Sequence, residues 1–161
     1  MNSIESVAKA RTEFLHAKQQ LCSAFETTPD ERLNWSPSDT SRTPIQIVAH
    51  AAAAIENVHG ILDGRPFPIK STAEADAFFR QSEKQFTTRA QVLRLLETNS
   101  AAYLRFLDAL TPQSLQTTVE MPFGLGATPM TAALDAAANH TKWHAAQIDY
   151  IQTIYGDHIW H

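Results

Sequence analysis

Two histidines near the C-terminus have the spacing of a metal-binding pair. His140 and His144 are four residues apart, so in a helix their side chains lie on one face, one turn apart. Neutral imidazole is a common metal ligand, and two rings placed in this way can share one ion. Chance alone produces such pairs in a chain with seven histidines. The spacing therefore needs support from the surrounding pattern.

That support comes from the apolar faces on which the histidines lie. In the last predicted helix, apolar residues at helical spacing share a face with His144, and His140 precedes it by one turn. In residues 44–62 a comparable apolar face includes His50. Burying an imidazole without a partner costs roughly 1–3 kcal/mol, so three inward histidines need partners. One metal ion would satisfy all three, and the nearby alanines would leave space for a pocket. The alternative is three core histidines that bond to neighbouring protein groups.

Start and stop signals predict the helices that would position these residues. Four long helices are expected, over residues 3–25, 44–62, 88–110 and 129–155. Thr43-Pro44 and Thr128-Pro129 resemble N-caps followed by a proline in the first turn. A short helix is expected over residues 73–81, and a turn over 31–35. Residues 117–127 are the least helical part, and no convincing alternating strand is found.

These elements predict an all-α protein, a four-helix bundle with short extra helices or turns in its loops. With 161 residues, the chain is expected to form one domain over 1–161. The net charge of −4 argues against nucleic-acid binding. The single Cys22 excludes an internal disulfide, fits a reducing cytoplasm and is interpreted as core packing. We expect no membrane association, because no signal peptide is recognised and no apolar run approaches the roughly 20 residues of a membrane span.

Three short motifs in this order resemble one known family. They are Trp35-Ser36-Pro37, the TPIQIVAH segment that ends at His50, and the HTKWHAAQ segment over 140–147. Their combination resembles the DinB-like superfamily of metal-binding four-helix bundles, which includes bacterial thiol-dependent transferases. The resemblance places the metal ligands at His50, His140 and His144. The chain departs from the commoner pattern at Ala145-Ala146, where a basic residue and glycine often precede the glutamine.

The resemblance also implies a chemistry. We expect one divalent metal ion per chain, with Zn or Ni favoured and Fe, Mn or Cu as alternatives. The metal would activate a low-molecular-weight thiol that attacks an electrophilic substrate, in a protein that forms a homodimer. No Asp or Glu stands out as a general base. The alternatives are a non-catalytic metal-binding or small-ligand-binding stress protein and a metal-dependent hydrolase.

The other histidines are not expected to bind this metal. His59 lies on the opposite helical face from His50 and is expected in solvent. His16 has no marked environment, and His158 and His161 lie in an exposed tail.

A few further side chains are candidates for supporting roles. Asn57 shares a helical face with His50, and Gln147 follows His144 by one turn, so both are candidates for hydrogen bonds to the histidines, with plain helix packing as the alternative. Trp35, Phe123 and Trp143 are candidates for pocket walls, with core packing as the alternative.

Overall fold

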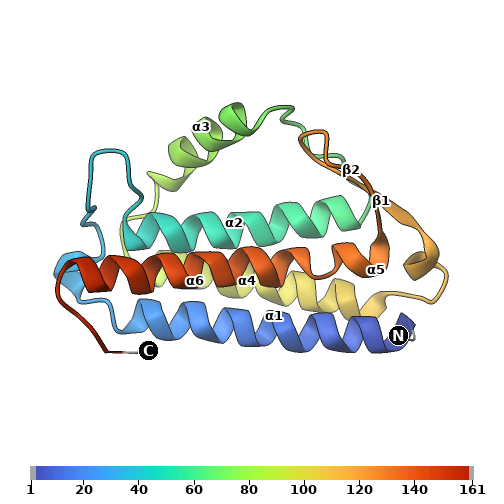
Figure 1. The fold of residues 1–161 in the computed structure, drawn as a ribbon, viewed down its shortest axis with the longest axis horizontal. Coiled ribbons are helices and arrows are strands. Elements are labelled where there is room, and N and C mark those ends of the chain that lie inside the picture. The colour runs from blue at the N-terminus through green and yellow to red at the C-terminus, as the bar shows by residue number, and fades with distance from the viewer. Residues whose placement is uncertain (1–2, 160–161) are drawn as a thin grey trace.

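Four long helices form the body of the protein (Figure 1). The computed structural model describes residues 3–159, with side chains from residue 5 onward. The long helices are α1 (Ser3–Glu26), α2 (Pro44–Leu62), α4 (Arg89–Ala109) and α6 (Ala136–Ile154). α6 packs between α1 and α2, and α2 also packs against α4. The predicted all-α four-helix bundle is confirmed.

The directions of the helices require long connections. In Figure 1, α2 and α4 run in one direction and α1 and α6 run in the other. Two parallel neighbours cannot be joined by a tight turn. The segment between α2 and α4 therefore crosses back over the outside of the bundle, and α3 (Thr72–Glu83) lies in this segment against α2. Short 3-10 turns at Asp30–Arg32 and Ser114–Gln116 complete the loops.

The starts of α2 and α4 are held by the same local interactions. The Thr43 hydroxyl accepts a hydrogen bond from the Gln46 backbone N–H, and the Gln46 side-chain oxygen accepts one from the Thr43 N–H. Thr88 and Gln91 repeat this capping box. The predicted start of α2 at Thr43-Pro44 is confirmed, and this start fixes where the following turns of α2 lie.

Three expectations for residues 117–135 are wrong. Residues Thr118–Met121 (β1) and Gly126–Pro129 (β2) form an antiparallel hairpin, where no strand was expected. Thr128 therefore pairs with Val119 and does not cap a helix. The last helix is split into a short α5 (Met130–Ala133) and α6. Four-residue strands are too short for alternation to appear in the sequence.

The core is one continuous cluster of buried apolar side chains from all four long helices. Its largest fully buried members include Phe14, Phe25, Ile55, Tyr103 and Ile148. Cys22 packs against this cluster, and burial raises the pKa of its thiol, as a packing role requires.

The most apolar helix lies within this core. α2 is long and apolar enough to cross a membrane by length and composition alone, a test that a buried core helix of a soluble protein also passes. However, 56% of the 18-residue apolar window within α2 is buried inside the bundle, where α2 packs against α4 and α6. Core packing is therefore sufficient to explain its apolar sequence.

Candidate metal centre

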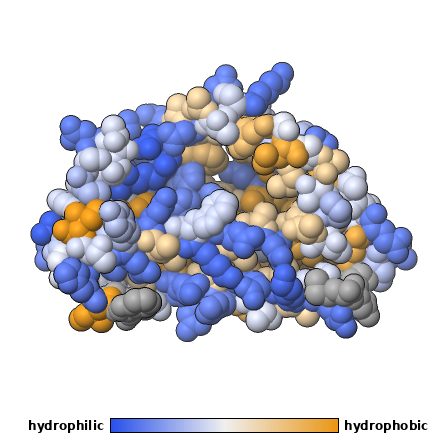
Figure 2. All heavy atoms as spheres, viewed as in Figure 1, coloured by the Kyte–Doolittle hydropathy of each residue, from blue (hydrophilic) through white to orange (hydrophobic). Residues whose placement is uncertain are grey.

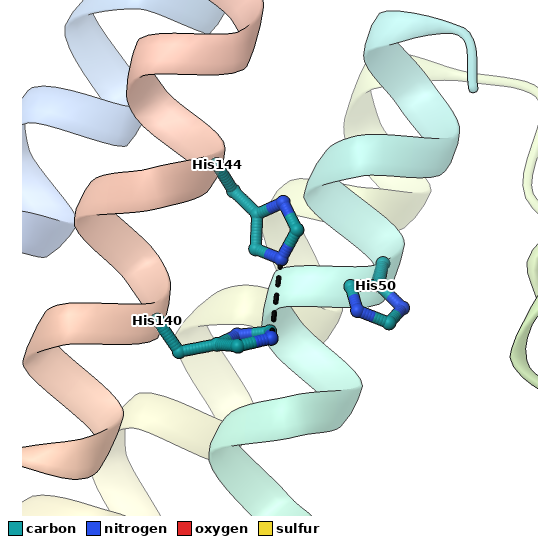
Figure 3. Close-up of side chains that lie close together, drawn as sticks. All are labelled: His50, His140 and His144. Atoms are coloured by element: carbon teal, nitrogen blue, oxygen red, sulfur yellow. Dashed lines mark hydrogen bonds between the residues drawn. The ribbon is translucent and has the colours of Figure 1, made fainter. Parts of the chain in front are cut away.

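His50, His140 and His144 meet between α2 and α6 (Figure 3). His50 projects from α2, and the other two project from successive turns of α6 toward it. The ring centroids lie 4.4 Å apart for His140–His144, 4.8 Å for His50–His144 and 5.3 Å for His50–His140. One nitrogen from each ring lies within 4.8 Å of the other two. The sequence prediction that these three residues lie together is thus matched by the geometry.

Hydrogen bonds assign the protons on two of the rings. His50 Nδ1 lies 2.9 Å from Glu83 Oε1, and a carboxylate oxygen only accepts, so Nδ1 donates. His144 Nδ1 lies 2.8 Å from Gln147 Oε1 and donates in the same way. In the neutral form of each ring, Nε2 is therefore the nitrogen that carries the lone pair. This pattern orients metal-bound histidines, in which the outer nitrogen donates and the inner one binds the ion.

His140 completes the set. Its Nε2 lies 3.3 Å from His144 Nε2. Two nitrogens bound to one tetrahedral ion at 2.0–2.1 Å lie about 3.3 Å apart, so this separation fits a shared ion. Its Nδ1 is buried and has no hydrogen-bond partner among residues 3–159. His144 carries its proton on Nδ1, so in the contact between the two Nε2 atoms only His140 can supply a proton. The lone pairs at the centre therefore outnumber the donors, and a bound cation would satisfy them.

Burial keeps His140 and His144 in the neutral form that binds metals. Desolvation, reinforced by the neighbouring imidazoles, lowers the pKa of His140 to about 3 and that of His144 to about 4. Both rings are therefore neutral at physiological pH, and a metal ion need not displace protons from them.

Glu83 is a site residue that the sequence did not reveal. It is the last residue of α3, only 2% exposed, and its second oxygen accepts a 2.7 Å hydrogen bond from Arg42 Nε. Burial alone would raise the pKa of Glu83, but the hydrogen bonds from His50 and Arg42 outweigh it and hold the pKa below its ordinary value. Glu83 is therefore an ionised anchor for His50. Glu83 was not identified from the sequence because the predicted helix over 73–81 ended two residues before it, and because a single glutamate beside Lys84 belongs to no recognisable motif.

Aromatic side chains cover the α3 side of the centre. The Phe79 ring packs edge-on against His50, with centroids 4.9 Å apart. Phe67 and Phe123 extend this wall, with Phe67 lying 6.3 Å from Phe79 and 5.5 Å from Phe123. Figure 2 shows a hollow on this face between α3 and the bundle, with hydrophobic residues along its rim.

Phe123, in the turn of the hairpin, has an unfavourable backbone conformation. Phe123 occupies the left-handed backbone region, with φ of 61°, in the turn that joins β1 and β2. This conformation costs a non-glycine residue roughly 1–2 kcal/mol. The strain places an aromatic ring in this wall, and the predicted role of Phe123 as a wall residue agrees with that position.

The remaining predicted residues lie in different environments. Gln147 bonds to His144 as expected, whereas Asn57 bonds to the Ala53 carbonyl of its own helix. Trp143 is largely exposed, with its ring 6.1 Å from that of His140, whereas Trp35 packs against Tyr155 away from the centre.

The remaining histidines lie outside the cluster. His59 is on the expected face but is only half exposed, because it packs against the Phe106 ring at 5.0 Å. His16 and His158 are exposed, and His161 lies outside the described residues.

Fold and site together define a four-helix bundle with a three-histidine candidate metal centre. The sequence profile of the DinB superfamily matches residues 13–148, and the chain belongs to this superfamily. Among solved structures, the chain is similar to YfiT from Bacillus subtilis, described as a probable metal-dependent hydrolase with an unusual four-helix bundle topology. The two share 21% sequence identity with a TM-score of 0.72, over 94% of this chain and 89% of YfiT. No curated protein matches the sequence.

Proposed function

We propose that the protein is a metal-dependent enzyme that transfers a low-molecular-weight thiol to an electrophilic substrate. The observation that supports this most is the convergence of three imidazoles, two of them oriented by Glu83 and Gln147. A divalent ion held by three histidines keeps coordination positions open and acts as a Lewis acid, which lowers the pKa of a bound thiol.

The protein groups around the centre fit a nucleophile that needs no separate base. Among residues 3–159, no Asp, Glu or Cys joins the three histidines in the cluster. Glu83 is already occupied by His50 and Arg42. A thiol has a pKa of about 8.5, so it loses its proton far more readily than water does. In the transfer, the sulfur forms a bond to an electrophilic carbon, the leaving group departs with its bonding pair, and the thiol proton passes to solvent.

The aromatic wall gives the electrophile a place to bind. Phe67, Phe79 and Phe123 present apolar rings on the side of His50 that faces α3. Such a wall binds apolar groups and excludes water from the reacting atoms.

Metal content is the first test. Elemental analysis of protein purified without an affinity tag should show about one divalent ion per chain, with Zn or Ni as our first expectation. His144→Ala should lose it, because that substitution removes one of three ligands. His59→Ala is the matched control, since His59 is a half-buried histidine on the opposite face of α2. Full occupancy in His144→Ala would refute the site.

Thiol binding is the second test. With Co²⁺ in the site, glutathione should produce a sulfur-to-metal charge-transfer band that is absent in His50→Ala. Turnover of a test electrophile should then require both thiol and metal. A band without turnover would indicate a binding protein.

Metal-dependent hydrolysis is the second candidate, favoured by the similarity to YfiT. A three-histidine centre also lowers the pKa of bound water to about 7 in known enzymes. Ester or amide cleavage that needs metal but no thiol would support hydrolysis over transfer.

A further inference from the structure

A groove of about 600 Å³ runs beside the metal centre along the outer face of α6. It is bounded by the loop before α2, by the start of α2, by α3 and by α6. Its lining consists of Pro37, Ser41, Arg42, Ile47, Arg80, Trp143, Ala146, Gln147, Tyr150, Ile151 and Ile154. Two of these residues connect it directly to the centre, since Gln147 bonds to His144 and Arg42 bonds to the carboxylate that holds His50.

One wall of the groove is apolar and open to solvent. Trp143, Tyr150 and Ile154 lie on one face of α6 and are 66%, 69% and 47% exposed. Large hydrophobic side chains that gather at this exposure around a concave surface are typical of ligand-binding sites.

The opposite wall contains two arginines that protein groups hold in place. Arg42 donates from Nε to Glu83 and from Nη2 to Asp76 at 3.0 Å. Arg80 donates from Nε to Asp76 at 2.7 Å and from Nη1 to the Thr40 carbonyl at 3.0 Å. In the described part of the chain, Arg42 Nη1 and Arg80 Nη2 donate no hydrogen bond. Each guanidinium is therefore oriented but keeps donors for a ligand.

With a metal ion at the centre, the charges around the groove would favour an anion. Arg42 and Arg80 balance Asp76 and Glu83, so a divalent ion held by the three histidines would add two positive charges that no further carboxylate offsets. Among residues 3–159, no Asp or Glu lines the groove. With a metal ion bound, the surroundings of the groove would be net positive in a chain of net charge −4, and this local charge would match an anionic ligand.

We propose that this groove binds the carboxylate part of the substrate thiol, with Arg80 as the specificity-determining residue. The thiol would lie along the apolar wall with its carboxylate at the two guanidinium groups and its sulfur at the metal centre. This inference rests on the proposed thiol function, and it names the substrate class as a carboxylate-bearing thiol.

The test compares three probes on the metal-loaded protein. They are glutathione, its diester, which has no free carboxylate, and S-methylglutathione, whose blocked sulfur cannot bind as a thiolate. The charge-transfer band of the Co²⁺ protein measures the affinity of the first two, and calorimetry measures that of the third. Glutathione should bind about tenfold more tightly than the diester, because a charge-assisted hydrogen bond contributes about that much.

Two variants test whether Arg80 causes the preference for glutathione over its diester. In Arg80→Gln the preference for glutathione over the diester should disappear, while the diester affinity stays unchanged. Arg11→Gln is the matched control, because Arg11 is a similarly exposed arginine paired with a carboxylate, Asp108, outside the groove lining. It should keep the preference. If thermal denaturation shows that Arg80→Gln is unfolded, Arg80→Lys should show a reduced preference instead.

The outcomes separate this proposal from the proposed function. Equal affinity for glutathione and its diester in the wild type, or a preference that survives in Arg80→Gln, overturns the groove but leaves thiol activation standing. The absence of a band with every thiol overturns the proposed function. In that case S-methylglutathione still tests whether the groove binds a carboxylate. Binding to the wild type that is abolished in Arg80→Gln supports the groove proposal, and no binding to the wild type overturns it.

Discussion

Glu83→Gln tests whether the buried carboxylate orients the metal ligand His50. Glu83 accepts hydrogen bonds from two donors, His50 Nδ1 at 2.9 Å and Arg42 Nε at 2.7 Å. An amide of the same shape has one acceptor oxygen and one donor nitrogen, so one of these donors must face an N–H group. If the oxygen stays with Arg42, His50 must move its proton to Nε2, the nitrogen that would bind the metal.

The expected losses of metal affinity and of stability in Glu83→Gln follow from this conflict between the two donors. Loss of an orienting partner of a metal-bound histidine lowers metal affinity by about 10- to 100-fold, which corresponds to about 1.4–2.7 kcal/mol. A buried donor left without an acceptor also costs about 1–3 kcal/mol, so the metal-free variant should unfold at lower denaturant concentration than the wild type.

A chromophoric chelator in competition for Zn²⁺ measures the affinity, and urea denaturation of the metal-free protein measures stability. Asp76→Asn is the control, because Asp76 is half exposed and bonds to Arg42 and Arg80 but to no histidine. Its metal affinity should stay within about twofold of the wild type, since exposed ion pairs contribute little. Equal metal affinity in Glu83→Gln and the wild type would refute the orienting role of Glu83.

Three further predictions follow from other parts of the structure. Tyr103→Phe should destabilise the protein by about 1–2 kcal/mol in urea denaturation without changing metal affinity, because the buried Tyr103 hydroxyl donates to the Leu134 carbonyl at the break between α5 and α6. Burial lowers the pKa of His140 and His144 in the folded state, so protons bind the unfolded chain better than the folded one. The free energy of unfolding of the metal-free protein should therefore be highest above pH 6.5, the pKa of the unfolded histidines, and should fall by about 2 kcal/mol per histidine by pH 5. Urea denaturation that is unchanged between pH 7 and pH 5 would contradict this. We also expect a homodimer, and light scattering at micromolar concentration that gives the 17.9 kDa mass of one chain would contradict it.

Local patterns in the sequence were sufficient for the long helices, apart from the start of the last one, and for the faces that bear the histidines. The capping box at Thr43 and the proline after it are contained in four consecutive residues, so the start of α2 could be read directly. The i, i+4 spacing of His140 and His144 likewise follows from helix geometry alone. Placing both together with His50 needed only the additional inference that apolar faces turn inward.

The tertiary structure alone decided what surrounds these histidines. Glu83 reaches His50 because α3 crosses back over the bundle between two parallel helices, and no short-range pattern encodes that path. The hairpin escaped prediction because its strands are only four residues long, and each is stabilised by pairing with the other. Arg42 and Arg80 lie 38 positions apart and share a groove only through their common bonds to Asp76. Periodicity determines the face on which a side chain lies, whereas its partner on another element depends on how the whole chain packs.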